Sequence, residues 1–153
     1  MRQVETVGDL EESVGYVLKR AAVALRAGMD AGLRPLKLTV PQYACLELLS
    51  QRPGLSNAEL ARGAFVTRQS MNGVLRGLQD RGLVTRPDTA PYGRARPTEL
   101  SSAGREQLHA ASAAVRTVEQ QMLSPLTSTQ QRRLRHDLAA CANALTSPAA
   151  TTD

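Results

Sequence analysis

Two helix starts that follow one another closely constrain the fold of this chain more than any other feature. Ser56 and Glu59 have the spacing of a capping box, in which two side chains bond backbone N–H groups reciprocally at a helix start. Thr67 can cap the next helix, so Phe65-Val66 must form a tight connection. An apolar stripe carries this helix to Gly82, the residue type most common just beyond a helix end. The sequence therefore predicts two helices joined by a turn.

A short hairpin is predicted directly after these helices. Residues 83–86 have strand character, residues 87–93 are rich in turn-forming Pro, Gly, Asp and Thr, and residues 96–100 can form the returning strand. A further helix is predicted to begin ahead of them at Thr39, a good N-cap. Helix, helix, tight turn, helix and hairpin is the order of a winged helix-turn-helix, which we predict over 39–101.

Long helices are predicted on both sides of this region. Apolar residues recur at three- and four-residue intervals between Leu10 and Met29, with Gly28, Gly32 and Pro35 expected to weaken the end of that helix. Ser101 can cap an alanine-rich helix that Pro125 ends, and a last helix follows. We therefore expect a mainly α fold with a small β-hairpin wing.

The excess positive charge lies entirely in one segment. Residues 62–96 hold seven arginines and two aspartates, a net charge of +5 that equals the formal charge of the whole chain. Residues 1–61 and 97–153 are each balanced. Such a local field attracts polyanions, and the planar arginine fork suits phosphate and guanine edges. A solvated basic face is the simpler explanation, and charge alone does not distinguish DNA from RNA or an acidic protein.

The motifs of common enzyme classes are missing from the sequence. It holds no Gly-x-Ser-x-Gly, phosphate loop, dinucleotide fingerprint or His-Glu-x-x-His, so we predict that the protein is not an enzyme. His109 and His136 lie in no cluster with metal-ligand spacing, and no metal or cofactor is predicted. Cys45 and Cys141 are interpreted as packing residues, with redox sensing as the alternative.

The chain is also expected to lie in the cytoplasm and to bind no membrane. No stretch approaches the roughly 18 uninterrupted apolar residues of a membrane span. Residues 1–10 carry acids and lack the apolar core of a secretory signal, so none is expected there.

Four stretches in register resemble the MarR family of winged-helix transcriptional regulators. The matching stretches are Leu38–Tyr43, Leu55–Ala61, Leu78–Arg86 and Leu100–Gly104. The resemblance implies a single domain over 1–146, with dimerisation helices at 9–35 and 102–146 and a flexible tail at 147–153. It further implies a homodimer that binds pseudo-palindromic operator DNA, usually as a repressor. Many relatives release DNA when a small phenolic or lipophilic effector binds.

Two positions depart from the family pattern. The wing usually carries Asp-x-Arg, whereas this chain has Tyr92-Gly93-Arg94 and so lacks the acid that would orient the arginine. The recognition helix often has an arginine where this chain has Gly73, and Gly77 is a second glycine in the same helix. Either the backbone approaches another group closely there, or packing holds the helix.

The polar residues of the second helix and of the wing are the candidate DNA contacts. Arg68 can read guanine, and Gln69 or Asn72 can read adenine, whereas Arg94 is expected to contact the minor groove or a phosphate. The candidate DNA-binding residues are Ser56, Thr67, Arg68, Gln69, Ser70, Asn72, Arg76, Arg94 and Arg96. Ordinary solvated helix surface, or capping for Ser56 and Thr67, explains the same residues without function.

The effector and the partner are less constrained than the DNA contacts. Tyr16 and Tyr43 are candidate aromatic residues of a ligand pocket, although core packing accounts for them equally. A redox-responsive regulator, or a winged-helix module that binds protein or RNA without a specific operator, stays open as an alternative function.

Overall fold

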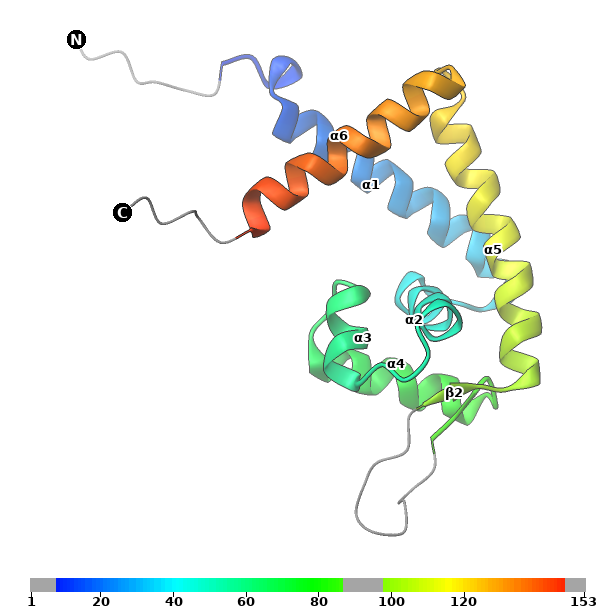
Figure 1. Ribbon diagram of the computed structural model, residues 1–153. Helices are drawn as coiled ribbons and strands as arrows, with labels where there is room; N and C mark the ends of the chain where they lie inside the picture. The colour runs from blue at the N-terminus through cyan, green and yellow to red at the C-terminus, as the bar shows by residue number, and fades with distance from the viewer. Residues whose placement is uncertain (1–7, 87–97, 148–153) are drawn as a thin grey trace, which may run out of the picture. The chain divides into compact units, whose positions relative to one another are not determined.

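The computed structural model describes residues 8–86 and 98–147, which are mainly helical (Figure 1). Its elements are α1 (Val14–Leu33), α2 (Val40–Gln51), α3 (Asn57–Gly63), α4 (Arg68–Asp80), β1 (Val84–Thr85), β2 (Glu99–Leu100), α5 (Ser102–Leu123) and α6 (Ser128–Thr146). The chain divides into two compact units, Met1–Val118 and Glu119–Asp153. The single domain over 1–146 stays a prediction. None of the described helices is both long and apolar enough to cross a membrane.

The core of the first unit lies among α2, α3 and α4, which gather beside the hairpin (Figure 1). The end of α1 and the first half of α5 add further buried residues to it. Its largest fully buried side chains are Leu33, Leu46, Leu60, Met71, Leu75, Leu78 and Cys45. Removing this much aliphatic surface from water is what holds three short helices together.

Local chemistry sets the helix starts as predicted. Ser56 and Thr67 are N-caps whose hydroxyl oxygens accept the N–H groups three residues on, at 3.2 Å and 3.0 Å. A reciprocal capping box forms at Thr39 rather than at Ser56. There Gln42 donates its N–H to Thr39 Oγ1 at 3.2 Å and accepts the Thr39 N–H at 2.9 Å.

The predicted glycine stop ends α4. Gly82 has φ of 71°, its N–H bonds the Gln79 carbonyl, and the Leu83 N–H reaches back to Leu78. This pair of bonds is a Schellman motif, which satisfies carbonyls that a helix end otherwise leaves open. The motif turns the chain directly into β1.

The predicted hairpin is present but short. β1 and β2 pair antiparallel, with Val84 opposite Leu100 and Thr85 opposite Glu99. Ser101 then fastens the end of β2 to the segment between α4 and β1. Its N–H donates to the Leu83 carbonyl at 3.0 Å, and its hydroxyl donates to the Gly82 carbonyl at 2.5 Å.

Helix α5 begins against the same backbone. The Ser101 hydroxyl oxygen accepts the Gly104 N–H at 3.0 Å, as an N-cap does. A Cβ at Gly104 would lie 3.0 Å from the Leu83 carbonyl carbon and closer still to its oxygen. Glycine is therefore required there by the close approach of two backbone segments.

Helix α1 ends at Leu33, just before Pro35, and two of its glycines have a packing role. The helix runs through Gly28 and Gly32 to Leu33. A Cβ at these positions would lie 2.8 Å and 3.5 Å from methyl groups of Val118 in α5. The two glycines therefore let α1 and α5 pack closely.

Candidate nucleic-acid interface

Helix α4 separates its apolar and polar residues onto opposite faces. Met71, Leu75 and Leu78 are buried in the core. The opposite face is exposed and carries Arg68, Gln69, Asn72, Gly73 and Arg76. Since α4 follows a short helix and a turn, it holds the place of the recognition helix in a helix-turn-helix.

The first turn of α4 offers hydrogen-bond donors to solvent. Thr67 Oγ1 accepts the Ser70 N–H and donates its own proton to Ser70 Oγ at 3.0 Å. Capping therefore uses both functions of the Thr67 hydroxyl, whereas the Ser70 hydroxyl keeps its proton for another acceptor. The N-terminal end of a helix also carries partial positive charge, which favours a phosphate.

Asn72 is held by a residue of α3. The Asn57 side-chain amide donates to Asn72 Oδ1, which orients that oxygen toward α3 while Asn72 retains its own amide protons. Reading adenine with two hydrogen bonds requires both ends of the amide. As placed, Asn72 can instead donate to an acceptor such as guanine O6 or a phosphate oxygen. The buried Asn57 Oδ1 has no hydrogen-bond partner among the described residues.

The arginines of the cationic segment divide into two groups. Arg68 and Arg76 are exposed and form no ion pair with any residue that the structure describes. Arg81 has a structural role, because its guanidinium donates to the carbonyls of Lys37 at 2.7 Å and Leu36 at 3.3 Å. The charge pattern could not separate these roles, since the partner of Arg81 is far away in the sequence.

The wing tip falls outside the described residues, and with it the predicted contacts Arg94 and Arg96 and the Tyr92-Gly93 departure. Gly73 and Gly77 are described. A Cβ at Gly73 would have no atom within 4 Å, and one at Gly77 would lie 3.5 Å from Gln42 Nε2. No close approach within the described chain therefore requires glycine at position 73.

The turn between α3 and α4 contains Phe65, for which the sequence predicted a tight connection but no role in binding. Phe65 has φ of 59°, in the left-handed region where glycine is usual, and its side chain is 94% exposed. Only its position just beyond a helix end, where glycine is the common residue, could have singled it out from the sequence.

The two tyrosines proposed for a ligand pocket lie in different surroundings. Tyr43 of α2 packs against the core, beside Glu47 and Ser112. Burial first, and then the negative charge of Glu47, raise the pKa of the Tyr43 phenol. The Ser112 hydroxyl donates to Glu47 Oε2 at 2.9 Å, which completes a small polar cluster between α2 and α5. Tyr16 lies on the exposed part of α1, and no described hydrogen bond joins it to this cluster.

The cysteines also differ. Cys45 is fully buried, and burial raises the pKa of its thiol to about 12, so the reactive thiolate is strongly disfavoured. This supports packing as its role. Cys141 on α6 is exposed as a free thiol.

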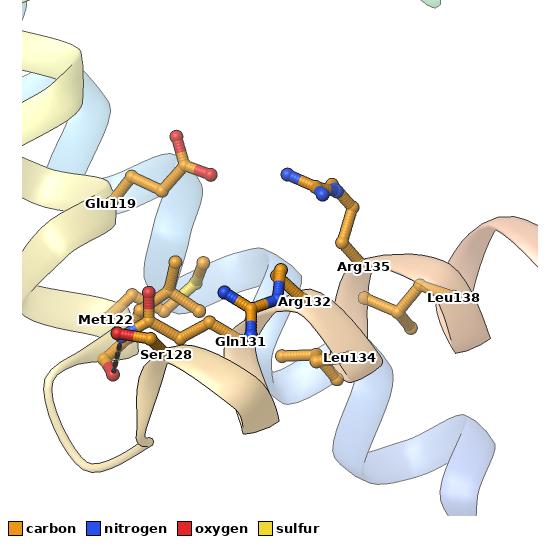
Figure 2. A pocket seen from close by; sticks show the side chains of 9 residues that line it. Glu119, Met122, Ser128, Gln131, Arg132, Leu134, Arg135 and Leu138 are labelled. Atoms are coloured by element: carbon orange, nitrogen blue, oxygen red, sulfur yellow. Dashed lines mark hydrogen bonds between the residues drawn. The ribbon is translucent and has the colours of Figure 1, made fainter.

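The second unit contains a cavity of about 390 Å³ between the end of α5 and the start of α6. Its apolar lining comes from Met122, Leu123, Leu134 and Leu138. Glu119 and Arg135 point toward one another across it (Figure 2). Gln131 closes the helix connection by donating to the carbonyls of Leu123 and Leu126 at 3.2 Å and 3.1 Å.

Known proteins resemble this chain over most of its length. A family model described as MarR family matches residues 36–95. The HTH-type transcriptional repressor Rv2887 of Mycobacterium tuberculosis is 47% identical over 125 residues, which cover 82% of this chain and 90% of the relative.

Solved structures of the M. tuberculosis MarR family protein Rv2887 are also similar to this chain. The complex with DNA has a TM-score of 0.72 and 44% identity, covering 84% of this chain and 97% of that one. The complex with salicylic acid has a TM-score of 0.74 and 44% identity, and the match covers 89% of this chain and 99% of that one. With the helix-turn-helix, the hairpin and the flanking helices in place, this chain belongs to the MarR family, whose members are transcriptional regulators rather than enzymes.

Proposed function

We propose that this protein is a homodimeric repressor that binds a pseudo-palindromic operator in the cytoplasm and releases it when a small aromatic acid binds. The observation that carries the proposal is the 47% identity to a repressor over 90% of its length, joined with the exposed polar face of α4. Structures of the same relative with DNA and with salicylic acid support both halves of the proposal.

The exposed residues of α4 supply two kinds of DNA contact. Arg68, Gln69 and Asn72 are exposed in the first half of α4 and carry side chains that can pair with base edges, so they are assigned to base edges in the major groove. Ser70, Arg76 and Ser56 are assigned to phosphates, whereas Thr67, whose hydroxyl proton goes to Ser70, supports the contact by capping α4. Arg94 and Arg96 are assigned to the wing contact, Arg94 in the minor groove or on a phosphate.

Exposed apolar side chains support dimerisation. On α1 and just before it, Leu10, Val14, Tyr16, Val17, Leu18 and Val23 are exposed, as are Leu134, Leu138 and Leu145 on α6. A monomer rarely leaves two such helix faces in water. We assign both faces to the interface with a second copy, and a symmetric dimer then sets half-sites roughly 10 bp apart.

The effector is assigned to the class of small phenolic or lipophilic acids, with salicylate as the probe. Tyr16 and Tyr43 remain the candidate pocket residues. The cluster of Tyr43, Glu47 and Ser112 offers polar groups where α2 meets α5. A redox-responsive regulator is the second candidate function, because Cys141 is exposed.

Fluorescence anisotropy with labelled DNA tests the proposal. The duplex comes from upstream of the protein's own coding sequence, and a shuffled duplex of equal length is the control, across a salt series. A preference of about 10³ or more for the upstream duplex, with one dimer per site, supports a specific regulator. Equal binding to both duplexes contradicts it. Release by salicylate, or by peroxide in wild type but not in Cys141→Ser, then separates the two regulatory candidates.

The wing contact has its own test. Arg94→Ala should weaken binding to all duplexes about equally and reduce the slope of log affinity against log salt by about 1. Equal slopes in the variant and the wild type would remove Arg94 from the set of phosphate contacts. Arg68→Ala should instead flatten the preference at one base position, which selection from randomised duplexes measures.

A further inference from the structure

We propose that Phe65, in the turn between α3 and α4, contacts the C5-methyl group of a thymine in each operator half-site and thereby specifies that base pair. The inference rests on the proposed function, since it assigns one more residue to the same DNA-binding surface.

The backbone of the turn holds Phe65 in an unusual conformation. The Phe65 N–H donates to the Arg62 carbonyl at 3.2 Å, and the Val66 N–H donates to the Ala61 carbonyl at 3.0 Å. This is a Schellman motif, in which Phe65 occupies the position that glycine usually takes. With φ of 59°, its Cβ crowds the backbone, so a phenylalanine is unfavourable there.

The side chain gives no compensation within the described chain. Phe65 is 94% exposed, whereas its neighbour Val66 packs against the core and Ala61 is buried. Val66 therefore anchors the turn, and Phe65 extends into solvent. An aromatic residue that is both strained and exposed contributes nothing to folding, which directs attention to a binding role.

The surroundings of Phe65 fit DNA as the partner. It lies two positions before Thr67, the N-cap of α4, and residues at this end of a recognition helix meet base edges in the major groove. Arg62 on one side and Arg68 on the other are exposed cations. The thymine methyl is the apolar group that base pairs present in that groove, and phenylalanine is among the residues that contact it.

The test uses the full-length protein and a duplex selected from a randomised library by the wild type. Thymines of one half-site are replaced one at a time by deoxyuridine, which removes only the methyl group. At one position the wild type should lose affinity about fourfold, the fold-change that corresponds to burying one methyl-sized group at ~0.8 kcal/mol. Phe65→Gly and Phe65→Asn should bind the original duplex more weakly and lose that discrimination.

Both variants are compatible with the turn, because glycine and asparagine adopt positive φ readily. Their melting temperatures should equal or exceed that of the wild type, which separates a lost contact from a lost fold. Arg86→Ala, a change at an exposed charge beyond the turn, is the matched control and should keep the deoxyuridine response. A wild type and a Phe65→Gly variant that respond equally at every thymine would overturn the proposal. Failure of the wild type to select any sequence would instead refute the proposed function.

Discussion

Replacing Gly104 with alanine should destabilise the folded protein by about 3 kcal/mol. The new Cβ would lie 3.0 Å from the Leu83 carbonyl carbon and closer to its oxygen, whereas Cβ atoms essentially never come within 3.0 Å of such atoms. The obstacle is backbone, fixed by the pairing of β1 with β2 and by the hydrogen bond from Ser101 to Leu83, so it cannot rotate aside as a side chain would.

The magnitude follows from three effects. Overpacking of this kind costs up to roughly 3 kcal/mol, and separating Ser101 from Leu83 loses a hydrogen bond worth about 1 kcal/mol. The higher helix propensity of alanine offsets about 1 kcal/mol of this. Gly73→Ala is the matched control, because no atom lies within 4 Å of its Cβ. It should stabilise the fold by about 1 kcal/mol.

Urea unfolding followed by circular dichroism measures the free energy of unfolding of both variants. The protein concentration is held fixed, because the stability of a dimer depends on concentration. A Gly104→Ala protein within about 0.5 kcal/mol of wild type, the ordinary range for a surface change, would refute the argument from close backbone approach. Equal changes in the free energy of unfolding in Gly104→Ala and Gly73→Ala would also refute it.

Three further results are expected. In the native protein at pH 8, a thiol reagent should leave Cys45 unmodified, because burial raises its pKa to about 12 and leaves about one thiolate in 10⁴ molecules. Rapid modification of two thiols per chain would contradict this. Ser101→Ala should cost about 2 kcal/mol in urea unfolding, because its hydroxyl makes two hydrogen bonds, and an unchanged midpoint would count against their importance. Asn57→Ala removes the hydrogen bond that orients Asn72 toward α3 and should shift the selected base at one position toward adenine. Identical selected sequences would show that Asn57 does not constrain Asn72.

The features that could be predicted from the sequence are those that depend on interactions between neighbouring residues. The N-caps at Ser56 and Thr67 and the glycine stop at Gly82 each depend on residues a few positions apart. The close packing of Gly28 against Val118 depends instead on a residue distant in the sequence, so local propensity could not predict it. Long-range packing overrides weak helix preferences in this way.

The same distinction applies to the candidate site. The exposed face of α4 follows from helical periodicity alone. The diversion of Arg81 to the carbonyls of Leu36 and Lys37, and the hold of Asn57 on Asn72, require the tertiary structure. The left-handed conformation of Phe65 was missed because a phenylalanine stands where the local pattern calls for glycine.

The fastening of the hairpin at Ser101 also bears on how regulators of this kind can diversify. Hydrogen bonds from Ser101, just before α5, to the Gly82 and Leu83 carbonyls close the root of the hairpin. Once a loop is closed at its root, lengthening it costs little, about 0.6 kcal/mol for each doubling. Insertions, deletions and substitutions between the two strands can therefore accumulate while the core stays intact. Operator preference and thermal stability can evolve as separate traits in this part of the chain.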